Sequence, residues 1–182
     1  MLKRYIVLGC FTCALGLPIR SRGQALPTSS RTGTMQLGFA GTRVSPDIGP
    51  THASGGTIYG DFDFVHNIGL EGDIHLASWR THDFIGEDSY LLGPRYSFHY
   101  RRVDVYGKAL FGIGRLLYQT NGNQGGYDAT YKIYAFGGGL DIHTIRHLNV
   151  RLIDLEEQEW PGYNPGGLSP FATTAGLAYA FR

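Results

Sequence analysis

Residues 171–182 read FATTAGLAYAFR, and this stretch decides the fold class of the chain. Side chains alternate between the two faces of an extended strand. One face of this strand is large, apolar and aromatic, and it consists of Phe171, Leu177, Tyr179 and Phe181. The opposite face, from Ala172 to Ala180, holds only Ala, Thr and Gly. A strand between lipid and a packed interior requires this pattern, so the stretch predicts the closing strand of a membrane β-barrel.

The amino terminus has the features of a secretory signal peptide. Two basic residues, Lys3 and Arg4, precede the apolar run of residues 5–17. Gly23 and Ala25 then place small residues at positions −3 and −1 of a cleavage site. Because a membrane-spanning helix needs about 20 apolar residues, the run is too short to be one.

The chain therefore divides into three predicted segments. We expect residues 1–25 to be a cleaved signal peptide, residues 26–33 a flexible lead-in, and residues 34–182 the barrel domain. Cys10 and Cys13 lie in the first segment, where they raise the alternative of a lipoprotein. The mature chain has no cysteine, so it forms no disulfide even in an oxidising compartment.

Composition excludes several classes of protein. Four of the 16 basic residues and none of the 15 acidic ones precede the predicted cleavage site, which leaves the mature chain with a net charge of −3. An acidic chain of this kind is not a nucleic-acid binder. Abundant glycine and aromatic residues favour strands and turns over helices. No segment after the signal has the 18 consecutive apolar residues of a transmembrane helix.

Eight segments alternate in the manner of strands, and each is about as long as a tilted strand that crosses a bilayer. They are residues 34–44, 56–66, 69–80, 89–101, 103–116, 130–142, 148–157 and 169–182. The links between them are alternately long and short, which is typical of an up-and-down barrel with one decorated rim. We therefore predict an all-β protein, an eight-stranded antiparallel up-and-down transmembrane β-barrel.

The polar faces of these strands carry charges of both signs near mid-strand. In a barrel with its apolar face outward, these side chains form an ion-pair network in the lumen. The predicted network consists of Asp61, Asp63, Glu71, Asp73, Arg95, Lys108, Asp141 and Arg151. A soluble lipocalin-like barrel, with the charges facing water, is the alternative.

Two further features bear on the orientation of the strands. Aromatic residues near strand ends predict interfacial girdles; they are Tyr59, Trp79, Tyr90, Tyr100, Tyr118, Tyr131 and Tyr179. In the seventh segment, Asp154 falls out of phase with Asn149 and Arg151, which predicts a β-bulge. The acidic run of residues 156–159 beside Trp160 marks the predicted start of an outer loop.

Four stretches resemble the small outer-membrane β-barrel proteins of the opacity and OmpA-like/OmpX-like superfamily. They are LLGPRYSF (91–98), VYGKALFGIGR (105–115), FGGGLDIHTIRHLNVRLIDLEE (136–157) and GLAYAF (176–181). The resemblance implies a location in the outer membrane of a Gram-negative-type bacterium, in contact with its lipids and lipopolysaccharide. It also implies periplasmic chaperones during export and barrel-assembly machinery that reads an aromatic terminal strand.

That terminal strand supplies the predicted insertion signal, made up of Phe171, Leu177, Tyr179 and Phe181, although Arg182 follows the last aromatic residue. We expect a monomer without the periplasmic domain of larger members of the superfamily.

The motifs of catalysis and cofactor binding are missing from the sequence. The seven histidines form no zinc-like cluster with cysteines, and the glycine runs do not lead into helices as phosphate loops do. We expect no enzyme, no cofactor and no metal, and a structural or surface-interaction role in adhesion or envelope integrity. A narrow channel, a lipid A-modifying enzyme using Ser97 and His99, and a secreted soluble carrier are the alternatives.

Overall fold

The computed structural model describes residues 33–45, 47, 52–65, 67–80, 85–118, 127–163 and 166–181. The predicted signal peptide, the lead-in before Gly33 and the terminal Arg182 lie outside these residues. The predictions made for those segments therefore stay predictions.

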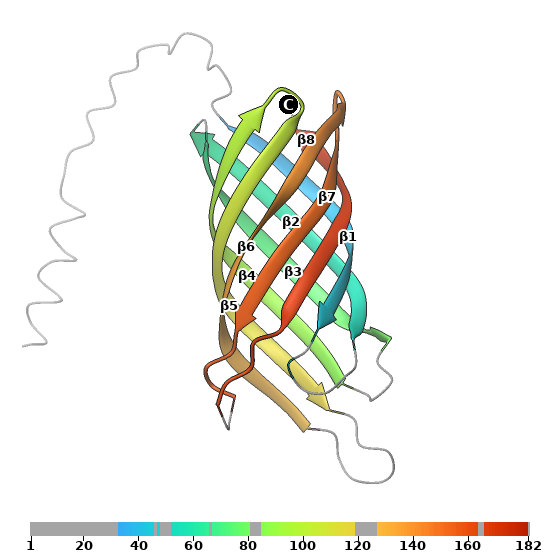
Figure 1. Cartoon of the computed structure of the whole chain (residues 1–182), viewed down its shortest axis with the longest axis vertical. Helices are drawn as coiled ribbons and strands as arrows, with labels where there is room; N and C mark the ends of the chain where they lie inside the picture. Colours follow the sequence, from blue (N-terminus) through green and yellow to red (C-terminus); the bar gives the residue numbers. More distant parts are fainter. Residues whose placement is uncertain are drawn as a thin grey trace, which may run out of the picture. The chain divides into compact units, whose positions relative to one another are not determined.

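Eight strands form a closed barrel in which each strand is antiparallel to its neighbours (Figure 1). They are β1 (Thr34–Ser45), β2 (Ala53–Val65), β3 (Ile68–Arg80), β4 (Ile85–Tyr100), β5 (Val103–Tyr118), β6 (Tyr127–Ile145), β7 (Leu148–Glu159) and β8 (Phe171–Phe181). The strand order around the barrel is the order in the sequence. The predicted eight-stranded antiparallel up-and-down barrel is confirmed.

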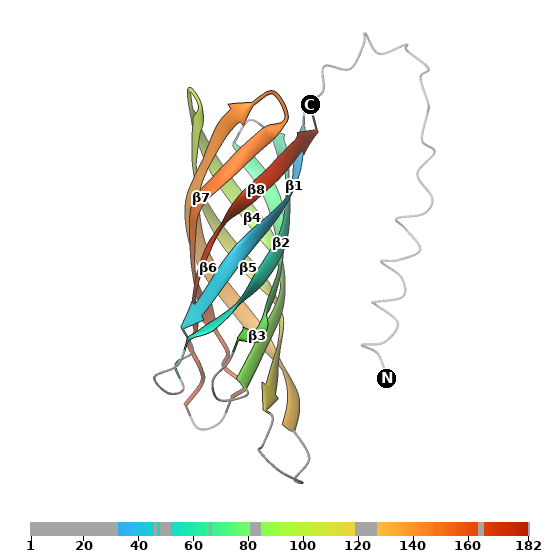
Figure 2. The same ribbon diagram turned by 90° about the vertical axis from the view of Figure 1, so that its right-hand side faces the viewer.

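The strand that decided the prediction closes the barrel. β8 lies between β7 and β1 (Figure 2). Its outward residues pair with outward residues of β1, as in the pairs Leu177 with Phe39 and Tyr179 with Leu37. The rings of Tyr179 and Phe181 meet edge to face, with centroids 5.0 Å apart. Large apolar side chains thus continue across the seam without a break.

The two ends of the barrel differ in their connections. At the end that we call the turn end, two-residue links at 66–67, 101–102 and 146–147 join successive strands. Arg101 has a φ of 56° there, a left-handed conformation that the tight turn requires. The opposite end, the loop end, carries the links at residues 46–52, 81–84, 119–126 and 160–170. β1 starts and β8 finishes at the turn end.

Several strands run further toward the loop end than their sequence patterns predict. β2 begins at Ala53, β4 at Ile85 and β6 at Tyr127, while β5 reaches Tyr118 and β7 reaches Glu159. The β5–β6 ladder continues to the pair Tyr118 and Tyr127. The β4 and β6 extensions break the apolar-out alternation on which the prediction relied, because their outward positions include Asp88 and Asp128.

The predicted bulge lies in β7. Opposite β6, the register passes directly from Arg151 to Ile153, and opposite β8 it shifts between Arg151 and Asp154. Two residues, Leu152 and Ile153, therefore take the place of one. The shift turns both Arg151 and Asp154 into the barrel, where each is at most 2% exposed.

The barrel is apolar outside and charged inside over most of its length. Large apolar side chains are exposed on all eight strands, and Phe39 and Phe136 are 65% and 61% exposed. Charged residues that face the lumen, such as Glu71, are almost completely buried. This polarity is the reverse of that in a soluble barrel.

None of the described residues form a helix long and apolar enough to cross a membrane.

Candidate functional site: the filled lumen

A cluster of charged side chains fills the middle of the lumen, and we call it the central network. It consists of Asp61, Glu71, Asp73, Arg95, Lys108, Asp141, Arg151, Asp154 and Glu156. Its members come from β2 to β7, and each is at most 5% exposed. Strand alternation places them there, because each occupies an inward position between outward apolar residues.

Arg95 joins three strands of the network. Its Nη1 lies 2.6 Å from Asp61 Oδ2 and 2.8 Å from Glu71 Oε2, and its Nη2 lies 2.9 Å from Asp141 Oδ2. Its Nε donates to Ser97 Oγ at 3.0 Å. A rigid guanidinium with five donors suits this task because it meets several carboxylates in one plane.

Arg151 makes a second junction beside the first. Its Nη1 lies 2.8 Å from Glu71 Oε1, and its Nε lies 3.1 Å from Asp141 Oδ1. The guanidinium carbon stands 3.7 Å from the centre of the Tyr59 ring and 4.9 Å from that of Tyr106. Cation–π contacts of this kind strengthen when they are shielded from water. The rings of Tyr59 and Tyr106 therefore fill space in the lumen beside the charged side chains.

Lys108 binds four carboxylates at once. Its Nζ lies 2.6 Å from Asp73, 2.7 Å from Asp154, 3.0 Å from Glu156 and 3.2 Å from Glu71. An ammonium group has three hydrogens, so these contacts use its full donor capacity. Buried charges are stable only when they are paired and hydrogen-bonded. Lys108 is therefore the hub on which the acidic side of the network depends.

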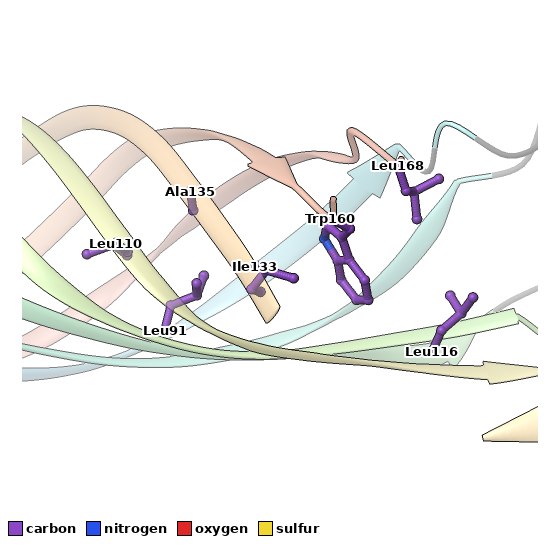
Figure 3. Close-up of a cluster of buried hydrophobic side chains, with 7 residues drawn as sticks. All are labelled: Leu91, Leu110, Leu116, Ile133, Ala135, Trp160 and Leu168. Carbon is purple, nitrogen blue, oxygen red and sulfur yellow. The ribbon is translucent and has the colours of Figure 1, made fainter. Parts of the chain in front are cut away.

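The lumen changes character toward the loop end. A cluster of buried apolar side chains that we call the apolar cap lies there (Figure 3); it consists of Leu91, Leu110, Leu116, Ile133, Ala135, Trp160 and Leu168. Trp160 is fully buried and its Nε1 donates to Gln158 Oε1 at 3.1 Å. A Cβ at Gly114 would lie 2.3 Å from the Trp160 ring, so this position requires glycine.

The link after β7 folds back to hold the tryptophan. The Trp160 N–H donates to the Leu168 carbonyl at 2.8 Å, which continues the antiparallel pairing beyond the strands. Gly166 and Gly167 have φ values of 97° and 87°, and only glycine adopts these readily. The Tyr163 N–H donates to the Trp160 carbonyl at 3.2 Å, and the Gly167 N–H donates to the Tyr163 carbonyl at 2.9 Å, so these described residues lie close to the tryptophan.

Outside the barrel, polarity changes at the same level. The outward residues of β5 to β7 near the loop end are polar and exposed, and they include Arg115, Asp128, Lys132, Glu157 and Glu159. Arg115 forms an exposed ion pair with Asp128. Along β5 to β7 the loop end is therefore mainly apolar inside and charged outside, like a soluble barrel, while Glu87 of β4 is a buried polar residue at the same end.

The structure brings together seven of the eight residues proposed for the lumen from the sequence. The eighth, Asp63, lies nearer the turn end and makes no ion pair with the central network among the described residues; its Oδ2 accepts from Thr34 at 3.5 Å. Sequence reasoning missed Asp154 and Glu156, which the bulge in β7 turns inward. Glu156 therefore belongs to a strand, and residue 160 is the first of the loop.

Two of the predicted girdle residues lie inside instead. Tyr59 is 1% exposed and stacks on Arg151. Tyr131 packs against Trp160, with ring centroids 6.1 Å apart. Both have the same strand parity as the charged residues, and this signal was available in the sequence. The side chains of Trp79 and Tyr118 lie outside the described part of the chain, whereas Tyr90, Tyr100 and Tyr179 are exposed as predicted.

Ser97 and His99, the two residues considered for lipid A chemistry, have different partners in the structure. Ser97 is fully buried and bonded to Arg95, whereas His99 is 44% exposed at the turn end and contacts Asp104. The two residues therefore do not form a nucleophile–base pair. The network and the cap both pack the interior of the barrel with buried side chains.

Comparison with protein-family models gave no match, and comparison with curated proteins gave none either. Solved structures are similar. Neisserial surface protein A matches with a TM-score of 0.62 and 12% identity over 82% of this chain and 97% of that chain. The chain has the fold of the small outer-membrane β-barrels.

Two other neighbours share this fold. Ail, the attachment invasion locus protein of Yersinia pestis, in complex with the heparin analogue sucrose octasulfate, matches with a TM-score of 0.53 and 18% identity over 82% of this chain and 97% of that chain. The outer membrane protein AlkL in lipid bilayers matches with a TM-score of 0.50 and 15% identity over 87% and 95%. The predicted resemblance is thus confirmed at the level of the fold.

Proposed function

We propose that this protein is an outer-membrane barrel whose sealed body presents its loop end at the cell surface, where it acts by contact rather than by transport or catalysis. The observation that carries the proposal is the reversal of polarity along the barrel. An apolar exterior with a charged lumen suits lipid outside. A charged exterior with an apolar lumen, at the loop end, suits water outside.

The exterior supports a position within a bilayer. The exposed apolar side chains form a belt around all eight strands, far larger than the few hundred Å² that soluble monomers expose. Arg115 and Lys132 mark where the belt ends on β5 and β6. With the turn end in the periplasm, β4, β5 and β6 project beyond the membrane toward the medium.

The lumen supports a sealed body. In its middle, the guanidinium of Arg95 stacks on the Tyr106 ring and that of Arg151 stacks on the Tyr59 ring. Trp160 packs in the apolar section nearer the loop end. Eight strands enclose only enough space for such side chains. A sealed barrel holds its surface loops on a rigid support. This favours a role in adhesion or envelope integrity over a narrow channel.

The partner that we propose for the loop end is a lipid, lipopolysaccharide or protein surface. The structure of Ail with sucrose octasulfate raises the question of polyanion binding. Among the exposed residues described at the loop end, four are acidic (Asp47, Asp128, Glu157 and Glu159) and three are basic (Arg43, Arg115 and Lys132). This near balance lacks the excess of positive charge that attracts sulfated chains.

Fractionation tests the location. Expressed in a Gram-negative host, the full chain is expected in the outer-membrane fraction, with gel mobility that changes on heating because closed barrels resist detergent. Protease added to whole cells should cut in 119–126, a glycine- and asparagine-rich loop, and leave the turn end intact. Recovery of the protein from the soluble periplasm would overturn the proposal and favour a soluble carrier.

Purified protein tests the sealed lumen. We expect only background current when the protein is added to planar bilayers. Stable single-channel currents would contradict the surface role and support a narrow channel instead. Release of fatty acid when the purified protein is incubated with lipid A would instead establish the alternative of a lipid A-modifying enzyme.

The insertion signal in β8 forms part of the same proposal. Phe181 pairs with Met35 at the seam of the barrel, so its loss also weakens closure. Deletion of residues 181–182 is expected to lower outer-membrane levels through poor recognition by the assembly machinery. Deletion of two residues from 119–126 is the control, and equal levels of both variants would refute the role of the terminal aromatic residue.

A further inference from the structure

Three metal-ligating side chains meet at the turn end, apart from the central network. Asp104 Oδ1 lies 2.8 Å from His99 Nδ1, and Asp104 Oδ2 lies 2.7 Å from His143 Nε2. The residues come from β4, β5 and β6, and their ligand atoms lie within 4.8 Å of one another. Two imidazoles and a carboxylate are a ligand set of transition-metal sites.

A chain of hydrogen bonds fixes the orientation of His143. Gln36 Nε2 donates to the carboxylates of Asp61, at 2.6 Å, and Asp141, at 3.2 Å, so Gln36 Oε1 must point away from them. That oxygen accepts from Asn149 Nδ2 at 2.7 Å. Asn149 Oδ1 then faces His143 Nδ1 at 2.9 Å and can only accept. Nδ1 of His143 therefore carries a hydrogen.

This orientation leaves Nε2 of His143 directed at Asp104. A neutral imidazole with its hydrogen on Nδ1 has a lone pair on Nε2. A lone pair and a carboxylate oxygen 2.7 Å apart attract only if a positive ion, either a proton or a metal, lies with them. Metal-binding histidines are held in the same way, with the other ring nitrogen donating to an oxygen.

The two other groups of acidic and histidine ligands inside the barrel are already occupied. Asp73 and Glu156, which meet His75, both contact Lys108 Nζ, and so do Glu71 and Asp154. The ammonium group takes the place that a cation would have there. Among the described residues, only the group at the turn end combines two histidines with a carboxylate.

The turn-end group is also accessible and lies near a second carboxylate. The His99 side chain is 44% exposed and that of His143 is 24% exposed, which gives an ion a path from solvent. Asp63 lies close enough to His99 and Asp104 to interact with both electrostatically. Its Oδ1 is shielded from solvent and has no hydrogen-bond partner in the described part of the chain.

We propose that His99, Asp104 and His143 form a binding site for one divalent transition-metal ion of the Zn²⁺ class. Nitrogen ligands select such ions over Mg²⁺ and Ca²⁺, which prefer oxygen alone. Asn149 is a positioning residue that orients His143, and the open side of the site leaves a coordination position for water. The bound ion would tie the β4–β5 turn to β6, where the Arg102 carbonyl already accepts from the His143 N–H at 2.8 Å.

Titration of the purified, folded barrel with ZnCl₂ tests the proposal. After treatment with EDTA and dialysis, calorimetry should show one Zn²⁺ per chain, and CoCl₂ should give the visible absorption of a site with nitrogen ligands. His143→Gln and His99→Gln should each weaken binding at least tenfold. Zn²⁺ should also raise the temperature at which the wild-type barrel loses its folded gel mobility, because ligands stabilise the state that binds them.

His147→Gln is the matched control. His147 lies at the same end, where Nδ1 contacts the Ala180 carbonyl at 3.1 Å and the ring stacks on Tyr179. This variant should bind Zn²⁺ as the wild type does. His99 is well exposed, so His99→Gln remains informative if His143→Gln fails to fold. Absence of binding by the wild type, or equal binding by wild type, His99→Gln and His147→Gln, would overturn the proposal.

Discussion

The middle of the barrel and its loop end solve the same packing problem with opposite chemistry. In the middle, Arg95, Lys108 and Arg151 neutralise carboxylates inside, while Phe111 and similar residues cover the outside. At the loop end, Trp160 packs inside and the charged groups lie outside. Polarity follows the surroundings of each section and not a rule for the whole barrel.

The difference shows what the buried charges achieve. Where both sides of a strand are dry, apolar residues on both faces would leave the choice of inward face unspecified. Charged side chains settle that choice, because they are costly in lipid. Where water surrounds the barrel, apolar burial settles it instead, so a tryptophan and leucines suffice.

Loss of a cation from the middle should have the largest effect. Arg151→Met leaves Glu71 and Asp141 buried beside no guanidinium from β7. We expect unfolding in urea to become easier by about 3–5 kcal/mol, the cost of breaking a buried ion pair from one side. Arg102→Met, at an exposed position of the turn end, is the control and should leave the midpoint unchanged.

The expected order of stability losses would be wrong if Arg151→Met had the same free energy of unfolding as the wild type. That result would mean that water enters the lumen and hydrates the carboxylates.

Removal of the tryptophan should cost about 3 kcal/mol, the lower part of the range for a large aromatic residue in a core. Trp160→Ala opens space beside Leu116 and Ile133 without leaving a charge unpaired. Circular dichroism during a urea titration measures the loss. The variant should still pass only background current, because the central network continues to fill the lumen. A conducting Trp160→Ala barrel would show that the cap alone makes the seal.

Arginine scanning of the outside sharpens the boundary between the two sections. Phe111→Arg places a charge within the apolar belt and should destabilise the barrel by about 2–4 kcal/mol in lipid vesicles. Thr130→Arg, outward on β6 beyond the belt, should cost less than about 1 kcal/mol. Equal costs at the two sites would remove the boundary that we place near Arg115 and Lys132.

The smallest effect is expected at the exposed ion pair. Arg115→Met breaks the contact with Asp128, and both side chains are 47% exposed. Water screens such pairs, so the unfolding midpoint should not change measurably at 0.15 M salt. A loss comparable to that of Arg151→Met would show that exposure does not separate the two kinds of ion pair.

The fold followed from the sequence because alternation is a local property. All eight strands were predicted, as was the bulge near Asp154, since each shows within a dozen residues. Tyr59 and Tyr131 were wrongly placed in the girdles because aromatic residues suit a membrane interface as well as a lumen, and Trp160 was considered only as the neighbour of an outer loop. Within a strand, whether a residue number is odd or even decides if its side chain faces the lumen or the membrane, but in β7 this rule reverses after residue 152 because of the bulge.

The membership of the central network was harder to predict than its existence. Asp63 has the correct parity, yet it lies one layer closer to the turn end than Asp61, beyond the contacts of Arg95. Which inward residues share a layer depends on the stagger between strands around the closed barrel. No short stretch of sequence records that stagger. The meeting of His99 with His143 across β5 was unseen for the same reason.

The bulge in β7 changes which residue positions of the strand face the lumen. Before Leu152, odd-numbered residues of the strand enter the lumen; after Ile153, even-numbered ones do. Deletion of Leu152 would remove the extra residue, restore strict alternation and leave Glu156, Gln158 and Trp160 facing the lumen, whereas regular pairing of the intact chain without the bulge would send them to the outer surface. The one extra residue in β7 therefore sets the inward face of everything up to the loop.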